Sequence, residues 1–257
     1  MVHVLSFDVV EDIVLALAAK NISEADLPSI KAAHLGPLVE LRHSGVQLQS
    51  CRWLDIGRHG QLACALESGV KWFSNSGAQG CVKVSQITAD RRFWTEFAMR
   101  GKKAATQSGF AADTAGQLFA AIGELRDNIC EHSENPASGY LIYDAAPGHF
   151  EFVVADSGVG VLTSLRSHHY YSHVTDAGTA LNLALSEGVS RHHDDRGRGR
   201  GFRPIFVGLA NASEHLRFCS GDHTREMMRA KDRGVLSSTR QRAPLNGFFC
   251  SVRCVQA

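Results

Sequence analysis

The sequence has little of several features that would narrow its class. Its 257 residues carry a formal net charge of only +1, so no overall charge attracts the chain to nucleic acid or to an anionic membrane. No apolar run approaches the length of a bilayer span. The seven cysteines include no Cys-x-x-Cys pair, so neither a zinc ribbon nor a disulfide framework is indicated. We therefore expect no membrane segment, and nucleic acid is an unlikely partner.

The rest of the composition is typical of an ordered globular chain. Hydrophobic residues make up 44% of the sequence and charged residues 21%, as in a protein with a packed core and a solvated surface. The length suffices for one large domain or two small ones. The first residues, Met1 to Asp8, lack the basic leader of a signal peptide. The scattered thiols suit a reducing compartment, and together these observations predict a cytoplasmic protein.

Residues 1–105 are expected to form a small α/β module. Short apolar runs suggest strands, and stretches with helical spacing separate them; the expected strands are Val2–Phe7, Cys51–Ile56 and Cys81–Val84, and the expected helices Val9–Ala19 and Gln61–Phe73. This layout is similar to that of STAS-type modules, the phosphorylatable partners in bacterial sigma-factor switches, although no motif supports the similarity. Asp90–Gly109 turns basic and then small and polar, which predicts a solvated helix, a linker and the domain boundary.

A second domain, residues 106–257, begins with a helix that carries two polar groups on one face. Thr114 and Gln117 have the spacing of a capping box. Glu124 and Asn128 are four residues apart and therefore lie one above the other on the helix. A stacked carboxylate and carboxamide could share one hydrated Mg²⁺ with a polyphosphate. An ordinary solvated helix face gives the same pattern, so this pair alone leaves both interpretations open.

Two strands, Tyr140–Asp144 and His149–Ala155, are expected next, joined by a Pro-Gly turn. The second of them runs into Asp156-Ser-Gly158-Val-Gly160. Two glycines that flank a single residue let the backbone approach a flat ligand closely. An aspartate at that edge can accept a hydrogen bond from an exocyclic amino group such as that of adenine. The alternative is a plain loop after a strand.

A glycine- and arginine-rich tract follows another expected helix, Asp176–Glu187. Glycine backbone amides that open a helix bind anions, arginines add charge, and glycines let a loop close as a lid; the residues concerned are Gly197, Arg198, Gly199, Arg200, Gly201 and Phe202, ahead of a helix expected over Pro204–Ala212. Binding of nucleic acid by this tract is the competing interpretation, but the tract is short and lacks interleaved aromatic residues.

The chain is expected to finish with strands over Glu214–Ser220 and Gly247–Val255. In the last strand every second side chain is apolar, so the Cys250/Cys254 pair is expected in the core and not at a metal. Several histidines fall near the expected pocket, but their spacing matches no zinc template; they are His168, His169, His173, His192 and His193.

The ordered trio of Glu124-x-x-x-Asn128, Asp156-x-Gly158-x-Gly160 and the Gly197–Gly201 segment resembles the GHKL superfamily of ATPases. Asp127 to Ser133 is most similar to the branch of bacterial anti-sigma serine kinases and stand-alone ATP-binding proteins. The resemblance implies an α/β sandwich of the Bergerat type with a mixed sheet, which binds ATP and Mg²⁺. It implies that Asn128 binds Mg²⁺, that Asp156 binds adenine, and that Glu124 orients or deprotonates the attacking group. Gly158 and Gly160 would approach the nucleotide, and the 197–202 loop would cover the phosphates.

Two departures from the family pattern leave more than one function open. A Gly-Thr pair near the last strand is replaced by Gly247-Phe248, and the lid glycines are separated by arginines. One hypothesis is a Mg²⁺-dependent ATPase or a kinase of a protein partner, with Glu124 catalytic. The other is a nucleotide-gated interaction module with little turnover. Either would act as a regulatory switch with a protein partner, and a homodimer is possible.

Overall fold

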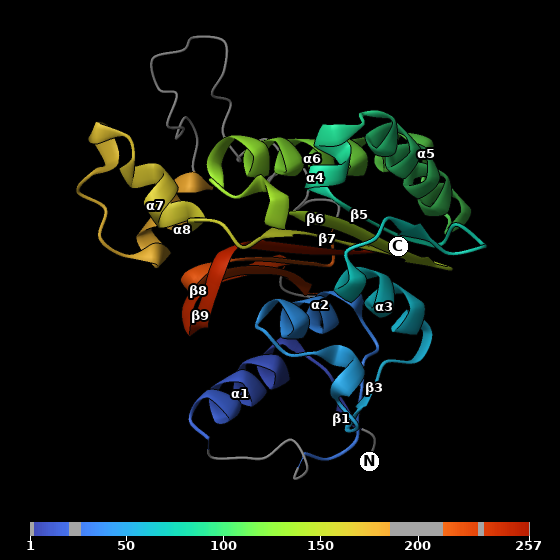
Figure 1. Ribbon diagram of the computed structural model, residues 1–257, viewed down its shortest axis with the longest axis horizontal. Helices are drawn as coiled ribbons and strands as arrows, with labels where there is room; N and C mark the ends of the chain where they lie inside the picture. The colour runs from blue at the N-terminus through green and yellow to red at the C-terminus, as the bar shows by residue number, and fades with distance from the viewer. Residues whose placement is uncertain (1–2, 21–26, 186–212, 231–233, 257) are drawn as a thin grey trace.

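The computed structural model describes residues 3–20, 27–185, 213–230 and 234–256, and it is organised in layers around one large sheet (Figure 1). The elements, in chain order, are β1 His3–Val4, α1 Phe7–Ala18, β2 Ile30–Lys31, α2 Leu35–His43, η2 Leu48–Ser50, β3 Leu54–Asp55, η3 Gly57–His59, α3 Gly60–Ser68, β4 Trp72–Phe73, β5 Gln79–Lys83, α4 Val84–Ala89, α5 Arg92–Gln107, α6 Ala112–His132, η4 Pro136–Ser138, β6 Tyr140–Ala146, β7 His149–Asp156, α7 Gly160–Arg166, η5 His169–Tyr171, α8 Ala177–Ala184, β8 His215–Ala230 and β9 Gly234–Val255.

The N-terminal part is a small parallel sheet, in the order β1-β2-β3, with helices between its strands. The Ser6 side chain accepts a hydrogen bond from the Val9 amide and so caps α1. α3 ends at Gly69, which adopts the left-handed conformation that favours glycine. The helix expected over Gln61–Phe73 is therefore shorter, and its last two residues form β4. The expected α/β class is confirmed here.

The second sheet has six strands in the order β4-β5-β6-β7-β9-β8. Each of its neighbouring pairs is antiparallel among the described residues, whereas a mixed sheet was expected. The β6–β7 hairpin turns at Pro147 and Gly148, as predicted, and Gly148 has a φ of +72°. The excursion through α4, α5 and α6 returns to the end of the sheet at which β5 leaves it, so β6 runs antiparallel to β5.

One face of this sheet is covered by α4, α5 and α6 (Figure 1). Apolar side chains of α6 pack against alternate residues of β7 and β9, including the pair Cys250 and Cys254, which are core residues as predicted. α5 packs Phe97 into the same core, fully buried. The expectation of a solvated helix and linker over Asp90–Gly109 was therefore wrong, because the charged residues occupy only the outer face of an amphipathic helix.

The other face of the sheet is covered by the N-terminal part, with α2 lying directly against it (Figure 1). Every residue of α2 from Leu35 to Leu41 is buried. A side chain on Gly36 would lie 2.3 Å from the Ser251 hydroxyl of β9, so α2 approaches the sheet closely. The expected boundary at residue 105 falls inside α5, and β4 and β5 already belong to the large sheet. The first hundred residues thus supply strands and a covering layer to the second sheet.

The carboxyl ends of the small parallel strands also face the large sheet. That edge is where open α/β sheets usually bind ligands. Here His34 lies 2.8 Å from the Glu151 carboxylate, which also accepts the Leu35 amide at the start of α2. The buried Asp144 carboxylate pairs with Arg58 and with His59. Carboxylates of β6 and β7 therefore fill this edge.

The hairpin of β8 and β9 is longer than the two expected strands, and its outer half extends as a two-stranded arm. A buried ionic network connects it to the N-terminal layer. The Arg217 guanidinium is 0% exposed and donates to Glu40 at 2.8 Å and to Glu11 at 2.6 Å. Arg242 donates to Glu40 at 2.6 Å, and Arg240 pairs with Glu11. Buried charges are tolerated only when paired in this way, so the network holds α1 and α2 in one position on the hairpin.

The expected capping box at Thr114 and Gln117 was wrong, because α6 starts three residues earlier, with Ala111 at the N-cap and no side-chain cap. In the described part of the chain, no helix combines the length and the apolar character needed to cross a bilayer.

Candidate functional site

The turn that follows β7 lies at the junction of three elements. Asp156 is the last residue of β7 and pairs in register with Phe248 of β9. The Val159 amide donates to the Ser133 carbonyl at the end of α6, at 2.9 Å. The Gly247-Phe248 pair, expected from the sequence beside this aspartate, is therefore adjacent to it.

Asp156 is a buried carboxylate with one oxygen left without a partner. The residue is only 3% exposed. One oxygen, Oδ1, accepts the Gly158 amide at 2.7 Å, while Oδ2 has no hydrogen bond or ion pair with any residue that the structure describes. Burial raises the pKa of this carboxyl from 3.8 to about 6, although the Gly158 hydrogen bond opposes the rise. A buried carboxylate without a cation partner is costly to the fold, and ionisable groups with pKa values shifted in this way concentrate at binding sites.

Contacts within the protein explain why both turn glycines are needed. A Cβ on Gly158 would lie 2.0 Å from the Ser133 carbonyl oxygen. Gly160 has a φ of +75°, and a Cβ there would lie 2.8 Å from the Ser220 hydroxyl. Close approach of a nucleotide was the expected reason for these glycines. Close approach of the protein's own backbone accounts for them without a ligand, so the glycines alone do not indicate nucleotide.

The two other predicted residues, Glu124 and Asn128, lie on α6, whose C-terminal end contacts the Asp156 turn. Asn128 lies five residues before Ser133, about 7.5 Å along the helix axis, and Glu124 lies one further turn away. Asn128 is half-buried and Glu124 is exposed. Neither side chain has a hydrogen bond or ion pair with another described residue. The neighbouring Asp127, by contrast, is held by Arg126 at 2.6 Å, so the structure leaves Glu124 and Asn128 available for a ligand.

Ser220 is a further residue of the turn that the sequence did not single out. Its buried hydroxyl donates to the Gly247 carbonyl at 2.8 Å and accepts the Val161 amide at 2.9 Å. These bonds tie β8 and β9 to the start of α7. The expected hydroxyl next to Gly247 is replaced by Phe248, and Ser220 provides a hydroxyl to the turn from the neighbouring strand. Only the β8–β9 register could reveal this, because the two positions are 27 residues apart.

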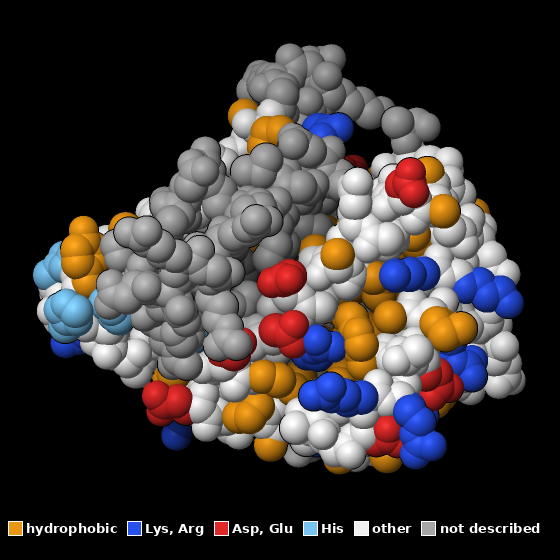
Figure 2. All heavy atoms as spheres, turned by 90° about the horizontal axis from the view of Figure 1, so that it is seen from above, with side chains coloured by type: hydrophobic (Ala, Val, Ile, Leu, Met, Phe, Trp, Pro, Cys, Tyr) orange, Lys and Arg blue, Asp and Glu red, His pale blue; other side chains and the backbone are white. Residues whose placement is uncertain are grey.

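The predicted lid residues Gly197, Arg198, Gly199, Arg200, Gly201 and Phe202, and the helix expected over Pro204–Ala212, lie outside the described residues. Of the five histidines, His192 and His193 lie outside them as well. The other three belong to the segment between α7 and α8, whose histidines gather at one edge of the molecule (Figure 2). The described residues contain no group of three or more His, Cys, Asp or Glu side chains arranged to hold a metal. A magnesium ion held mainly by phosphates, water and one amide oxygen needs no such group.

No protein-family model, curated protein or solved structure matches the chain. The interpretation of the turn therefore depends on the chemistry of its own residues.

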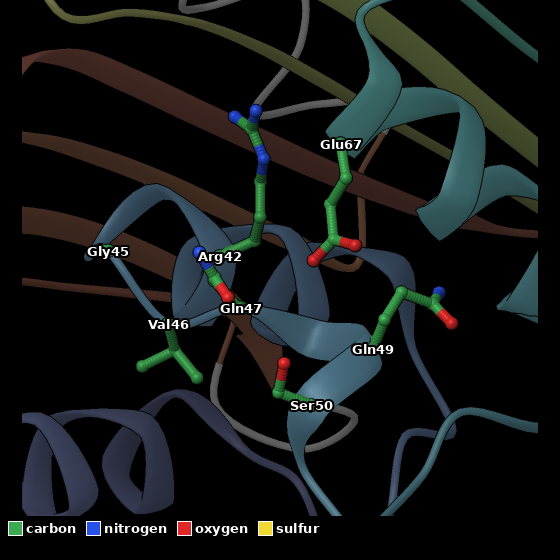
Figure 3. Close-up of a pocket in the computed structure, with 7 residues that line it drawn as sticks. All are labelled: Arg42, Gly45, Val46, Gln47, Gln49, Ser50 and Glu67. Atoms are coloured by element: carbon green, nitrogen blue, oxygen red, sulfur yellow. The ribbon is translucent and has the colours of Figure 1, made fainter.

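A separate pocket of about 550 Å³ lies in the N-terminal layer, at the end of α2 and beside α3 (Figure 3). It contains none of the predicted site residues. The Glu67 carboxylate on its wall already accepts the Leu48 amide at 2.6 Å. Its lining is polar and largely exposed, unlike the mostly apolar sites that hold a flat base; the lining residues are Arg42, Gly45, Val46, Gln47, Gln49, Ser50 and Glu67.

Proposed function

We propose that the chain binds ATP with Mg²⁺ beside the Asp156 turn and α6, and that it hydrolyses the nucleotide or transfers its γ-phosphate to a protein partner. The proposal rests on the resemblance of the ordered motifs to the GHKL superfamily and on the buried carboxylate of Asp156. This carboxylate is 3% exposed and keeps one oxygen without a partner among the described residues. An exocyclic amino group such as that of adenine would supply the missing donor.

The side chains of α6 suit the phosphate end of such a ligand. Asn128 offers a carboxamide oxygen, the type of ligand that Mg²⁺ accepts. When bound there, Mg²⁺ would neutralise charge on the phosphates. Glu124, one turn away and free of partners in the described part of the chain, would orient or deprotonate the attacking water or hydroxyl. Phosphoryl transfer depends chiefly on such positioning and charge stabilisation.

A nucleotide-gated interaction module with little turnover is the second candidate, and one observation favours it. The arm of β8 and β9 contacts α8 on one side, through the bond from the Thr239 hydroxyl to Asn182 at 2.9 Å. On its other side Arg240 pairs with Asp8 of α1 at 2.8 Å. A change in α8 on nucleotide binding would therefore reach the N-terminal layer directly.

Calorimetric titration with Mg²⁺–ADP and Mg²⁺–ATP tests binding, and release of labelled phosphate tests turnover. We expect Asp156→Asn to abolish binding, because the carboxylate oxygen that faces the amino group becomes an NH₂ donor. We expect Glu124→Ala to retain binding and to lose phosphate release by a factor of roughly 10² or more. Asp127→Ala is the matched control, since Asp127 is occupied by Arg126 and its loss should leave both properties unchanged.

Each outcome distinguishes the candidates. Release that depends on Glu124 supports the hydrolase or kinase. Tight binding without release supports the gated module. A wild-type protein that binds neither nucleotide would refute both.

A further inference from the structure

α2 crosses the large sheet on the side opposite the Asp156 turn, and its last residue, His43, is half-buried. At the other end of the helix, His34 pairs with Glu151. At the C-terminal end, the His43 ring lies between β6 and β9. Its Nδ1 is 2.7 Å from the Tyr140 hydroxyl and its Nε2 is 3.1 Å from the Asn246 carbonyl oxygen.

The partners of His43 fix its tautomer. Burial lowers the pKa of this imidazole from 6.5 to about 4, so the ring is neutral near pH 7 and carries one N–H. A carbonyl oxygen can only accept, so the proton lies on Nε2 and is donated to Asn246. Nδ1 then accepts the hydrogen of the Tyr140 hydroxyl. Both ring nitrogens are therefore satisfied by groups of the large sheet.

The strand register places His43 directly behind the end of β7. Tyr140 of β6 and Phe249 of β9 are both register partners of Ala155. The His43 ring contacts the first of these rings at 5.8 Å and the second at 5.9 Å between centroids. Asp156, the next residue, has its side chain on the opposite face because side chains alternate along a strand. His43 and Asp156 thus lie on opposite sides of the same few residues of sheet.

The bond to Asn246 reaches the turn through the backbone. Gly247 follows Asn246 and has a φ of +73°. A Cβ at Gly247 would lie 2.1 Å from the Asp156 carbonyl oxygen and 2.6 Å from the Gly158 nitrogen. The Gly247 carbonyl also accepts the Ser220 hydroxyl. A hydrogen bond that fixes the peptide between Asn246 and Gly247 therefore fixes the surface on which the Asp156 turn rests.

We propose that His43 is a positioning residue through which the N-terminal layer holds the Asp156 turn in its nucleotide-binding shape. This role rests on the proposed function, since it assigns the turn to nucleotide. It gives the N-terminal layer a part in the same site, although the layer lies on the other side of the sheet.

The experiment compares His43→Ala, His43→Gln and His34→Ala in the full chain. Each is titrated with Mg²⁺–ADP, and exchange of the amides of Gly158, Val159 and Val161 is followed without nucleotide. Gln keeps an N–H close to the position of Nε2 and should restore the bond to Asn246. His34→Ala is the matched control, because it also removes an imidazole that binds the sheet, but at the far end of α2.

We expect His43→Ala to raise the ADP dissociation constant on the order of tenfold, the factor that corresponds to the loss of about one hydrogen bond. The amides of the turn should exchange faster. His43→Gln should recover most of the affinity, and His34→Ala should bind ADP as the wild type does. If His43→Ala does not fold, Tyr140→Phe, which removes the hydroxyl that holds Nδ1, should weaken binding in the same direction.

Unchanged affinity in both His43→Ala and Tyr140→Phe overturns the proposal. An equal loss of affinity in His43→Ala and His34→Ala also overturns the proposal, because it would show that any weakening of the contact between α2 and the large sheet has this effect. A wild-type protein that binds no ADP refutes the proposed function and this role with it. If the wild type binds ADP and the His43→Ala and Tyr140→Phe variants bind it equally well, only the role of His43 is refuted.

Discussion

Asp156→Asn should stabilise the nucleotide-free protein while it abolishes nucleotide binding. The wild-type carboxylate is buried, and its one hydrogen bond, from the Gly158 amide at 2.7 Å, does not offset the loss of hydration. An asparagine has nearly the same shape, keeps an oxygen that can accept this amide, and carries no charge. The substitution therefore removes a charge that the fold accommodates poorly.

The pKa of Asp156 sets the size of the effect. Its rise from 3.8 to about 6, at about 1.4 kcal/mol for each pH unit, corresponds to a cost of about 3 kcal/mol when the group is ionised. Asparagine accepts the Gly158 amide less strongly than a carboxylate does, so we expect a net gain of about 1–2 kcal/mol at pH 8. Since the folded-state pKa is raised, protonated Asp156 stabilises the fold below pH 3.8, and this contribution is lost as the pH rises through about 6. The advantage of asparagine should therefore shrink as the pH falls below 6.

Urea unfolding at pH 8 and at pH 5 measures this difference. The contrasting variant is Asp144→Asn on the neighbouring strand. Burial also acts to raise the pKa of Asp144, but hydrogen bonds from His59 and Arg58 prevail and the net shift is downward. Removing this carboxylate takes the charged acceptor from the buried His59 and Gln79 side chains and from the exposed Arg58, so Asp144→Asn should destabilise the protein. Two buried aspartates should thus respond in opposite directions.

The reasoning is refuted if Asp156→Asn is less stable than the wild type at pH 8, or if its effect is the same at both pH values. In the wild type, affinity for Mg²⁺–ADP should fall as the pH drops through about 6, because a protonated carboxyl no longer accepts the amino group on that oxygen. A flat affinity from pH 8 to pH 5 contradicts the assignment of Asp156 to the base.

Three further predictions follow from packing and burial. Glu40→Gln should lower the free energy of unfolding by roughly 3–5 kcal/mol in urea, because it unpairs the buried Arg242 and takes one carboxylate from the buried Arg217; a change below 1 kcal/mol contradicts this. Gly158→Ala should lower the free energy of unfolding by roughly 1–3 kcal/mol, because the new side chain clashes with the end of α6. Gly116→Ala, within α6 and with open space around it, should raise the free energy of unfolding by at most about 1 kcal/mol. A thiol reagent should modify Cys64 and Cys130 in the native protein and the five buried thiols only after unfolding; rapid reaction of all seven would refute the described core.

The local backbone structure around the candidate site was largely predictable from the sequence. The Pro147-Gly148 turn and the alternation in β7 and β9 depend on neighbouring residues, and the structure confirms them. The adjacency of Asp156 and Gly247 was also anticipated. The capping box was not confirmed, because helix ends depend on packing as well as on local propensity.

The N-terminal layer was the part that local patterns could not place. Trp72 and Phe73 were expected at the end of a helix, and the strand expected at Cys81–Val84 has nothing in its sequence that states which sheet it joins. The same holds for α2, which is buried from Leu35 to Leu41 between two sheets and contains a buried glutamate. The burial of Glu40 is explained by its ion pair with Arg217, which is 177 residues away. A pairing between residues so far apart produces no periodic pattern in the sequence.

The sequence by itself determined the α/β class, the helix of Glu124 and Asn128 and the strand that ends at Asp156, because each follows from residues within a few turns or strands. The tertiary structure alone decided what covers the second face of the sheet, why Gly158 and Gly160 must be glycine, and that Ser220 lies beside the candidate site and His43 behind it. Those features depend on contacts between residues far apart in the chain, and they form only when the large sheet is assembled.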